Sequence, residues 1–289
     1  MPSIRKINEV RPGTVTLEGA GVRLRRMFGF ERVPGLDPFL LLDDFSSHDP
    51  NDYLAGFPWH PHRGIETITY LLKGEVAHGD SMGNRGVIGP GEVQWMTAGS
   101  GIIHQEMPRE SRETGLTGFQ LWANLPAAEK MMAPRYREIL SRQIPLVSRA
   151  DGVKIRIICG TVDGVQGPVR EIRIDPEFLD VDIPAGVVFS HQLPSAYAVF
   201  AYIFAGQGFF APGSKKPVGT ENLVTFSDGD GLEISGGDKG VRFLLVAGRP
   251  LGEPVAWRGP IVMNSEEELR LAFAEYAQGS FLKHKAMPG

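Results

Sequence analysis

Apolar and polar residues alternate over short stretches along most of the chain, a pattern typical of half-buried β-strands. Segment 22–27 alternates apolar side chains with arginines, and segment 66–72 is rich in β-branched and aromatic residues. The 36 glycines and 22 prolines interrupt such segments at short intervals, and together they exceed the roughly 12% usual for soluble proteins. Many short strands separated by turn residues predict an all-β fold of the sandwich or barrel type.

One segment near the C-terminus shows helical instead of strand periodicity. Ser265 and Glu268 have the spacing of a capping box, in which each side chain accepts a hydrogen bond from a backbone N–H at the start of a helix. Apolar residues then recur at helical spacing up to Gly279, a residue typical of the position after a helix end. We therefore expect a helix over 265–278 whose apolar side packs on a barrel.

A weak internal repeat indicates that the β fold is duplicated. Residues 70–75 resemble residues 202–207 at an offset of 132 positions, and the Pro-containing segment 134–147 has the character of a linker. We expect an N-terminal domain over 1–140 and a C-terminal domain over 141–289, the second ending in the helix.

Charge and composition exclude several classes of protein. The chain has 30 Lys and Arg against 34 Asp and Glu, a net charge of −4, so it lacks the basic stripe of a protein that binds nucleic acid directly. The longest apolar run, 196–205, is half the length of a membrane span, and no secretory signal is evident. We expect a cytoplasmic protein without membrane contact. The single cysteine, Cys159, excludes a disulfide framework and is expected to lie buried in a strand.

Two pairs of residues have the spacing of metal ligands on strands. His60 and His62 form one pair, and His104 and Glu106 form the other. Residues i and i+2 of a strand point to the same face, so both pairs can converge on one point. Three imidazoles and a carboxylate suit Fe, Mn, Co, Ni, Cu or Zn and leave open coordination positions. The alternative is ordinary surface or core histidines, but three of the seven histidines fall in these two pairs.

Two neighbours of the first pair allow several interpretations. Unbroken alternation places Glu66 on the same face as His62, where it is a further ligand, a hydrogen-bond partner of an imidazole, or is displaced by a bulge at Gly64. Arg63 has the opposite parity, and we expect it to pair with a carboxylate and support the structure.

Four longer motifs resemble the pirin family of the cupin superfamily. The resemblance covers most of residues 10–140 and, more loosely, the whole chain. The motifs are 60–67 (HPHRGIET), 94–99 (QWMTAG), 101–108 (GIIHQEMP) and 121–126 (LWANLP).

The resemblance implies a bicupin, with two β-barrels and a metal in the N-terminal one only. Pirins hold that metal with three His and one Glu, which correspond here to His60, His62, His104 and Glu106. Since the Glu of the second pair is the pirin ligand, Glu66 is expected to support a metal-binding imidazole without binding the metal itself. We expect one divalent metal, Fe(II) by analogy, with Mn, Ni, Co, Cu or Zn as alternatives.

The second half of the chain lacks a matching ligand set. At the repeat offset, His60 corresponds to Gln192 and His62 to Pro194, whose side chain offers no ligand atom. His191 is displaced by one position and has no second histidine beside it. We therefore expect a structural or regulatory role for the second barrel.

The family resemblance implies an oxidoreductase, a quercetin 2,3-dioxygenase that opens the flavonol heterocycle with loss of carbon monoxide. Glu106 is then both ligand and general base, and burial supplies the raised pKa that a base needs. Residues expected to line an aromatic pocket, or else to form plain core, are Phe45, Phe57, Trp95 and Met107.

Two other functions fit the same resemblance. The first is an iron-dependent, redox-responsive regulatory protein that binds a transcription factor or a metabolic enzyme. The second is an enzyme that acts on another small phenol or an oxidised metabolite.

Overall fold

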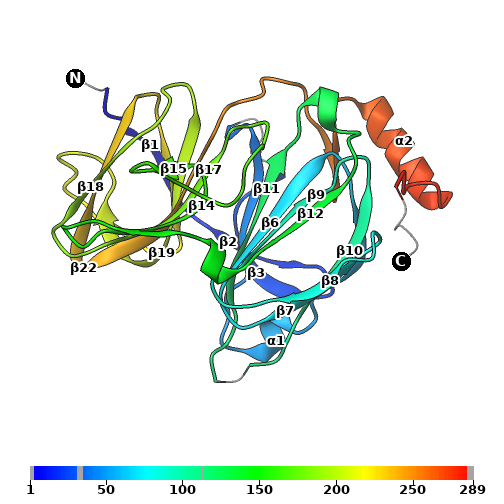
Figure 1. The fold of residues 1–289 in the computed structure, drawn as a ribbon, viewed down its shortest axis with the longest axis horizontal. Helices are drawn as coiled ribbons and strands as arrows, with labels where there is room; N and C mark the ends of the chain where they lie inside the picture. Colours follow the sequence, from blue (N-terminus) through cyan, green and yellow to red (C-terminus); the bar gives the residue numbers. More distant parts are fainter. Residues whose placement is uncertain (1–2, 31–34, 112, 285–289) are drawn as a thin grey trace. The chain divides into compact units, whose positions relative to one another are not determined.

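The computed structural model describes residues 3–30, 35–111 and 113–284 and is mostly β (Figure 1). The chain divides into two compact units. The described residues within 14–33, 39–141 and 251–289 form the first, which we call the N-terminal barrel. Those within 1–13, 34–38 and 142–250 form the second, the C-terminal barrel. The bicupin fold expected from the sequence is confirmed.

The ends of the chain are exchanged between these units. Among the described residues, 3–13 belong with the C-terminal barrel and 251–284 with the N-terminal barrel. The reason is pairing. Strand β1 (Ile7–Pro12) runs antiparallel to β21 (Asn222–Phe226), and helix α2 (Glu266–Ala277) packs beside β23 (Ala256–Arg258) and β24 (Ile261–Met263).

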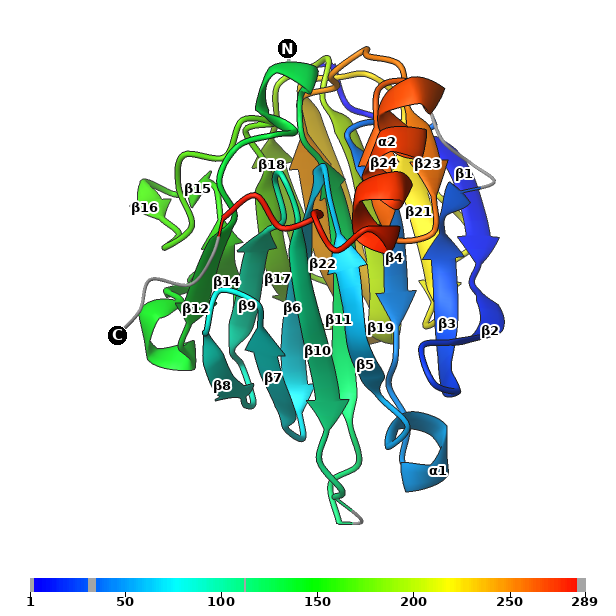
Figure 2. The same ribbon diagram turned by 90° about the vertical axis from the view of Figure 1, so that its right-hand side faces the viewer.

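Two sheets build the N-terminal barrel (Figure 2). The larger sheet has the order β12 (Arg135–Ile139), β9 (Val93–Thr97), β6 (Ile65–Lys73), β11 (Thr117–Asn124), β4 (Phe39–Asp44), β3 (Val22–Phe28), β2 (Thr14–Glu18). The smaller sheet has the order β5 (Phe57–His62), β10 (Ile102–Pro108), β7 (Val76–Asp80), β8 (Arg85–Ile88). Short helical turns connect some strands, at α1 (Pro50–Tyr53), η2 (Ala127–Glu129) and η3 (Ser141–Gln143).

One nine-stranded sheet curves around the core of the C-terminal barrel. Its path is β1, β21, β19 (Ala198–Phe209), β22 (Gly231–Gly248), β17 (Glu177–Ile183), β14 (Lys154–Cys159), β13 (Leu146–Ser148), with β18 (Val188–Gln192) on β22 and β20 (Val218–Gly219) on β19. A small separate ribbon pairs β15 (Thr161–Val162) with β16 (Val165–Gln166). Cys159 lies buried in β14, as expected, and its thiol donates to the Val169 carbonyl at 3.3 Å.

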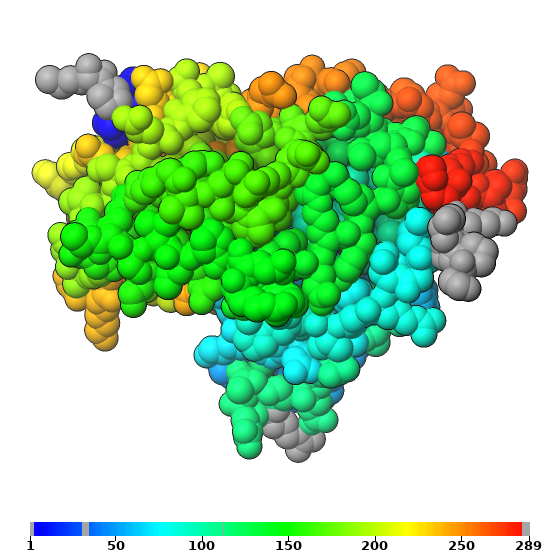
Figure 3. All heavy atoms as spheres, viewed as in Figure 1, coloured from blue at the N-terminus to red at the C-terminus, as the bar shows by residue number. Residues whose placement is uncertain are grey.

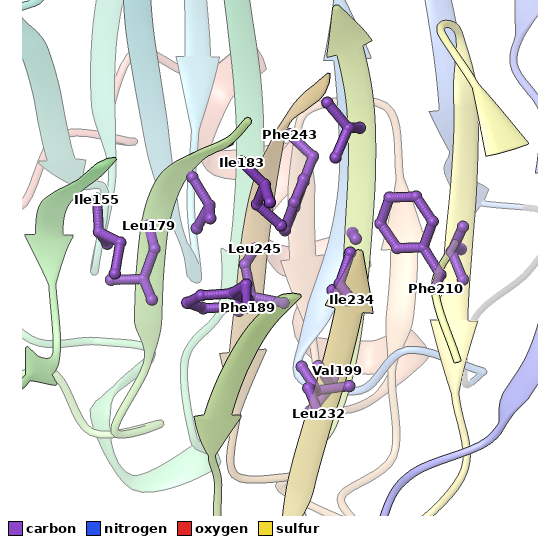
Figure 4. Packing of buried hydrophobic residues seen from close by; sticks show 14 of the residues in the cluster. Ile155, Leu179, Ile183, Phe189, Val199, Phe210, Leu232, Ile234, Phe243 and Leu245 are labelled. Atoms are coloured by element: carbon purple, nitrogen blue, oxygen red, sulfur yellow. The ribbon is translucent and has the colours of Figure 1, made fainter. Parts of the chain in front are cut away.

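Apolar side chains fill the interior of the C-terminal barrel (Figure 4). Phe243 of β22 makes edge contacts with Phe189 and Phe210, with ring centroids 6.4 and 5.3 Å apart. Ile155, Leu179 and other aliphatic residues from β14, β17, β19 and β22 complete the cluster. A core filled in this way stabilises the barrel by removing apolar surface from water, and packed side chains occupy its interior.

The two repeat segments form equivalent strands. Residues 70–73 end strand β6 and residues 202–207 lie in strand β19, and each strand is the third from one end of its sheet's path. Tyr70 and Tyr202 are fully buried, and Gly74 and Gly206 both take positive φ. The duplication predicted from six matching residues is therefore visible in the placement of both segments.

The predicted C-terminal helix is confirmed as α2, between caps at Ser265 and Gln278. The Ser265 side chain accepts from the Glu268 backbone N–H, and the Glu268 carboxylate accepts from the Ser265 backbone N–H. In the space-filling view, the red C-terminal residues lie against cyan and green residues of the same unit (Figure 3). No helix in the described ranges is long and apolar enough to cross a membrane.

Candidate metal centre

Three histidines meet on the smaller sheet of the N-terminal barrel. His60 and His62 come from β5 and His104 from β10, and the antiparallel register places His104 directly opposite His60. One ring nitrogen of each histidine lies within 4.8 Å of the others. His62 and His104 are buried, whereas His60 is partly exposed. The sequence prediction that these three side chains converge agrees with this geometry.

Backbone carbonyls fix the tautomers of two of these rings. Nδ1 of His60 lies 2.8 Å from the carbonyl oxygen of Pro58, and Nδ1 of His62 lies 3.1 Å from that of Pro260. A carbonyl can only accept, so Nδ1 carries the hydrogen in both rings, and in the neutral form of each ring Nε2 presents a lone pair. The two Nε2 atoms are 3.1 Å apart. Two facing lone pairs repel each other, and a cation placed between them removes that repulsion.

The third imidazole and the pKa values of the buried rings also fit a bound metal. Nε2 of His104 is buried and has no hydrogen-bond partner among the described residues, a costly arrangement unless a ligand satisfies it. Burial lowers the pKa of His62 and of His104 well below the usual range, and the neighbouring imidazoles lower it further. Both rings are therefore neutral at physiological pH, the form that binds metals. The donor set fits a divalent transition metal.

Glu106 lies two residues beyond His104 on β10 and is buried, but it is not part of the group of three nitrogens. Its carboxylate accepts hydrogen bonds from Thr69 Oγ1 and from Gln120 Nε2, both at 2.8 Å. The indole N–H of Trp122 donates to Gln120 Oε1 at 3.1 Å, which fixes the amide with its NH₂ toward Glu106. Each carboxylate oxygen keeps a second lone pair that can bind a metal. The role of Glu106 as fourth ligand stays a prediction.

The support that Glu66 is expected to give the imidazoles stays a prediction, because the hydrogen bond seen at Glu66 comes from another residue. The Glu66 carboxylate accepts from Thr97 Oγ1 at 2.6 Å, on the neighbouring strand β9. The alternation of β5 does not continue into β6, because Gly64 between them has φ +78° and interrupts the strand. Burial raises the pKa of this carboxyl group. Arg63, by contrast, pairs with a carboxylate as expected, with NH1 2.8 Å from Glu275 Oε2.

A pocket of about 810 Å³ opens beside the histidines. His60 and His62 form part of its wall, and Trp122 stands edge-on to His62 with ring centroids 5.0 Å apart. Trp257 continues this wall, with its ring centroid 6.0 Å from that of Trp122, and Phe30 contacts the Trp257 ring in turn. Aromatic walls of this kind favour a planar, largely apolar ligand.

Of the four side chains expected to line the pocket, only Phe57 does so. Phe45 belongs to an apolar cluster, Trp95 is fully buried on β9, and Met107 does not reach this pocket. Sequence reasoning missed both tryptophans of the wall. Trp122 shares the parity of Gln120 on β11, a signal that could have found it, whereas Trp257 lies far along the chain with no local signal.

Part of the pocket lining is charged. Arg26 donates to both carboxylate oxygens of Asp43, at 2.9 and 2.7 Å, and to Glu18 at 2.7 Å. Burial raises the pKa of Asp43 to about 6 despite the bidentate arginine. One guanidinium facing two carboxylates leaves this part of the lining net negative when both acids are ionised, so it disfavours anionic ligands.

The C-terminal barrel shows no comparable group of ligands among its described residues. Nε2 of His191 lies 2.6 Å from Glu177 Oε2, within hydrogen-bond distance of this carboxylate. This histidine is therefore engaged in a local ion pair or hydrogen bond.

Comparison with known proteins agrees with these observations. The family model described as Pirin matches residues 21–123, and the model described as Pirin C-terminal cupin domain matches residues 178–282. A Pseudomonas aeruginosa protein named "Putative quercetin 2,3-dioxygenase" is 42% identical, covering 96% of this chain and 99% of that protein. Human pirin is 40% identical, covering 90% of this chain and 88% of that protein.

A solved structure shows the same fold over the full length. The crystal structure of quercetin 2,3-dioxygenase from Acinetobacter baumannii superposes with a TM-score of 0.88 at 28% identity, covering 99% of this chain and 100% of that one. Since both family models match in order and the relatives are similar over nearly their whole length, this chain belongs to the pirin family.

Proposed function

We propose that this protein binds one divalent transition metal through His60, His62 and His104, with Glu106 as the fourth ligand, and opens the ring of flavonols or similar phenols as a quercetin 2,3-dioxygenase does. The observation that carries the proposal is the group of three imidazoles, two of which form part of the wall of an aromatic pocket. The names of the relatives and of the superposed enzyme support the reaction class.

The metal that best fits the family is Fe(II), while Mn, Co, Ni, Cu and Zn suit the same imidazole and carboxylate donors. When bound, such a metal acts as a Lewis acid toward a phenol oxygen and brings it together with dioxygen. The pocket lies beside the nitrogens that would hold the metal, so substrate and metal share one site.

The protein's own residues then orient the substrate and move its proton. The tryptophan wall stacks a planar ring and excludes water from it. Glu106 accepts the proton of the flavonol 3-hydroxyl, while Thr69 and Gln120 hold the carboxylate in place. The flavonol and one dioxygen together yield the ring-opened ester and one carbon monoxide, so no further reductant is needed.

Anaerobic reconstitution tests this function. The protein stripped of metal is loaded with Fe(II), Mn, Co, Ni or Cu, and quercetin and air are then added while substrate absorbance and carbon monoxide are measured. We expect multiple turnovers with at least one metal, and Glu106→Gln should retain metal but lose turnover.

Two results contradict parts of this proposal. If no metal supports multiple turnovers, the oxygenase function fails, and partner capture that changes between the Fe(II) and Fe(III) forms becomes the function to test. If Glu106→Gln loses the metal, Glu106 is chiefly a ligand and its role as base has no support.

A further inference from the structure

The C-terminal segment, residues 251–284, contacts the metal centre directly although it follows the second barrel in the chain. The Pro260 carbonyl accepts from Nδ1 of His62 and so sets the tautomer of that ring. The next residues run beside the end of β5, where the Val262 backbone N–H donates to the Arg63 carbonyl at 3.1 Å. The orientation of one imidazole therefore depends on where this segment lies.

Arg63 anchors the same segment from the side of the barrel. Its guanidinium is buried, with NH1 2.8 Å from Glu275 of α2 and NH2 donating to the Phe281 carbonyl at 2.8 Å. It also stacks on the Phe281 ring, 4.2 Å from the centroid. One side chain next to His62 in sequence thus holds both the helix and the residues that follow it.

The backbone leaves little room for movement at this contact. A Cβ on Gly64 would lie 1.9 Å from the Val262 carbonyl oxygen, so only glycine permits the approach. Lys130 Nζ donates to the carbonyls of both Gly64 and Val262, at 2.9 and 3.1 Å. Close packing of this kind transmits a shift of the segment to its neighbours instead of absorbing it.

From these contacts we infer that the C-terminal segment is a working part of the metal centre, and that Arg63 is the positioning residue that holds the Pro260 carbonyl against His62. The inference rests on the proposed metal site but not on the proposed oxygenase reaction. A hydrogen-bond partner such as the Pro260 carbonyl fixes the tautomer and direction of a metal-binding imidazole, and loss of such a partner weakens metal binding about 10- to 100-fold.

The variant Glu275→Gln tests the inference, because it keeps the size of the side chain and removes the charge that holds Arg63. The Co(II)-loaded protein is the probe. Its dissociation constant is measured by competition titration and its ligand geometry by the visible absorption of Co(II). We expect the dissociation constant to rise about 10-fold or more, with a changed absorption spectrum.

Lys283→Ala is the matched control. Lys283 pairs with the other carboxylate oxygen of Glu275 at 2.7 Å and is partly exposed, so its loss leaves the Arg63 contact intact. We expect the control to keep the parent spectrum and a dissociation constant within about twofold. If Glu275→Gln does the same while folded by circular dichroism, the inference is overturned.

A second variant decides the outcome if Glu275→Gln does not fold. Phe281→Leu keeps the backbone carbonyl that Arg63 binds and removes only the stacked ring, and the same two measurements should shift in the same direction by a smaller amount. An unchanged spectrum and affinity in Phe281→Leu would then reject the inference. A parent protein that binds no Co(II) would instead reject the proposed metal site itself.

Discussion

The two barrels of this protein share a repeat but use their interiors differently. In the N-terminal barrel the interior carries histidines, Glu106 and the amide of Gln120, several of them held by hydrogen bonds, and a pocket opens beside the histidines. In the C-terminal barrel the corresponding space is filled by aliphatic and aromatic side chains. A duplicated fold therefore has one copy stabilised by apolar packing and one in which buried polar groups make a binding site.

The difference follows from few positions. Where the first barrel has His60 and His62, the repeat places Gln192, which is exposed, and Pro194. Neither can join a group of inward-facing nitrogens. Once the ligands are absent, nothing opposes filling the interior with residues such as Phe243, because burial of apolar surface stabilises the fold.

The largest expected contrast concerns metal content. His104→Ala removes one of the three gathered nitrogens, and we expect its dissociation constant for metal to rise at least about 1000-fold, equivalent to about 4 kcal/mol. His191→Ala, in the other barrel, should keep the parent metal content. Elemental analysis after dialysis measures both variants, and equal metal in the two would refute the assignment of the site to the N-terminal barrel.

Packing should show the opposite contrast. Phe243→Ala opens a cavity among Phe189 and Phe210 in the C-terminal barrel, and we expect a loss of about 3–5 kcal/mol in the free energy of unfolding with unchanged metal affinity. Denaturant titration of the apoprotein measures the loss. A cost below about 1 kcal/mol would mean that this interior is not closely packed.

The polar interior should also make the N-terminal barrel sensitive to pH. Burial lowers the pKa of Lys130 from 10.5 to about 7. Between these values the unfolded chain holds a proton that the folded one lacks, so raising the pH favours the folded state. Relative to Lys130→Met, we expect wild-type stability to increase by about 1–3 kcal/mol from pH 7 to pH 9.

Denaturant titrations at the two pH values check this difference. Phe243→Ala is the control, because its cost should be the same at both pH values. If the free energy of unfolding of the wild type, relative to that of Lys130→Met, stays constant or decreases as the pH rises, the lowered pKa of Lys130 is contradicted.

The smallest effect concerns the helix cap. Ser265→Ala removes the side chain that accepts from the Glu268 backbone N–H, and we expect a loss of about 1 kcal/mol in the N-terminal barrel alone. Ser265→Asn should preserve most of the stability, since Asn caps helices equally well. Thermal unfolding of the three proteins measures the effect, and similar losses in both variants would argue against the cap.

Features encoded by local patterns could be predicted from the sequence. The convergence of His60, His62 and His104 follows from strand parity, and helix α2 follows from its capping residues and its spacing of apolar positions. The family resemblance added the two-barrel fold. These signals work because each depends on residues a few positions apart.

Features set by distant backbone pairing could not be predicted. Pro260 reaches His62 across 198 positions, and Trp257 enters the pocket on the same segment. The direction of Glu66 depended on the break at Gly64, and the alternation of its neighbours left such a break as one of three alternatives without deciding among them. Local sequence does not specify which far segment supplies a carbonyl or an aromatic wall.

The exchange of chain ends has a consequence for how the protein is made. The histidines of β5 and β10 leave the ribosome early, but the carbonyl that orients His62 and one tryptophan of the pocket wall belong to residues 251–284. Domains commonly fold in order during synthesis, the N-terminal one first. Here the first barrel stays unfinished until residues 251–284 have been synthesised, so the finished site can take up metal only after the second barrel has been made.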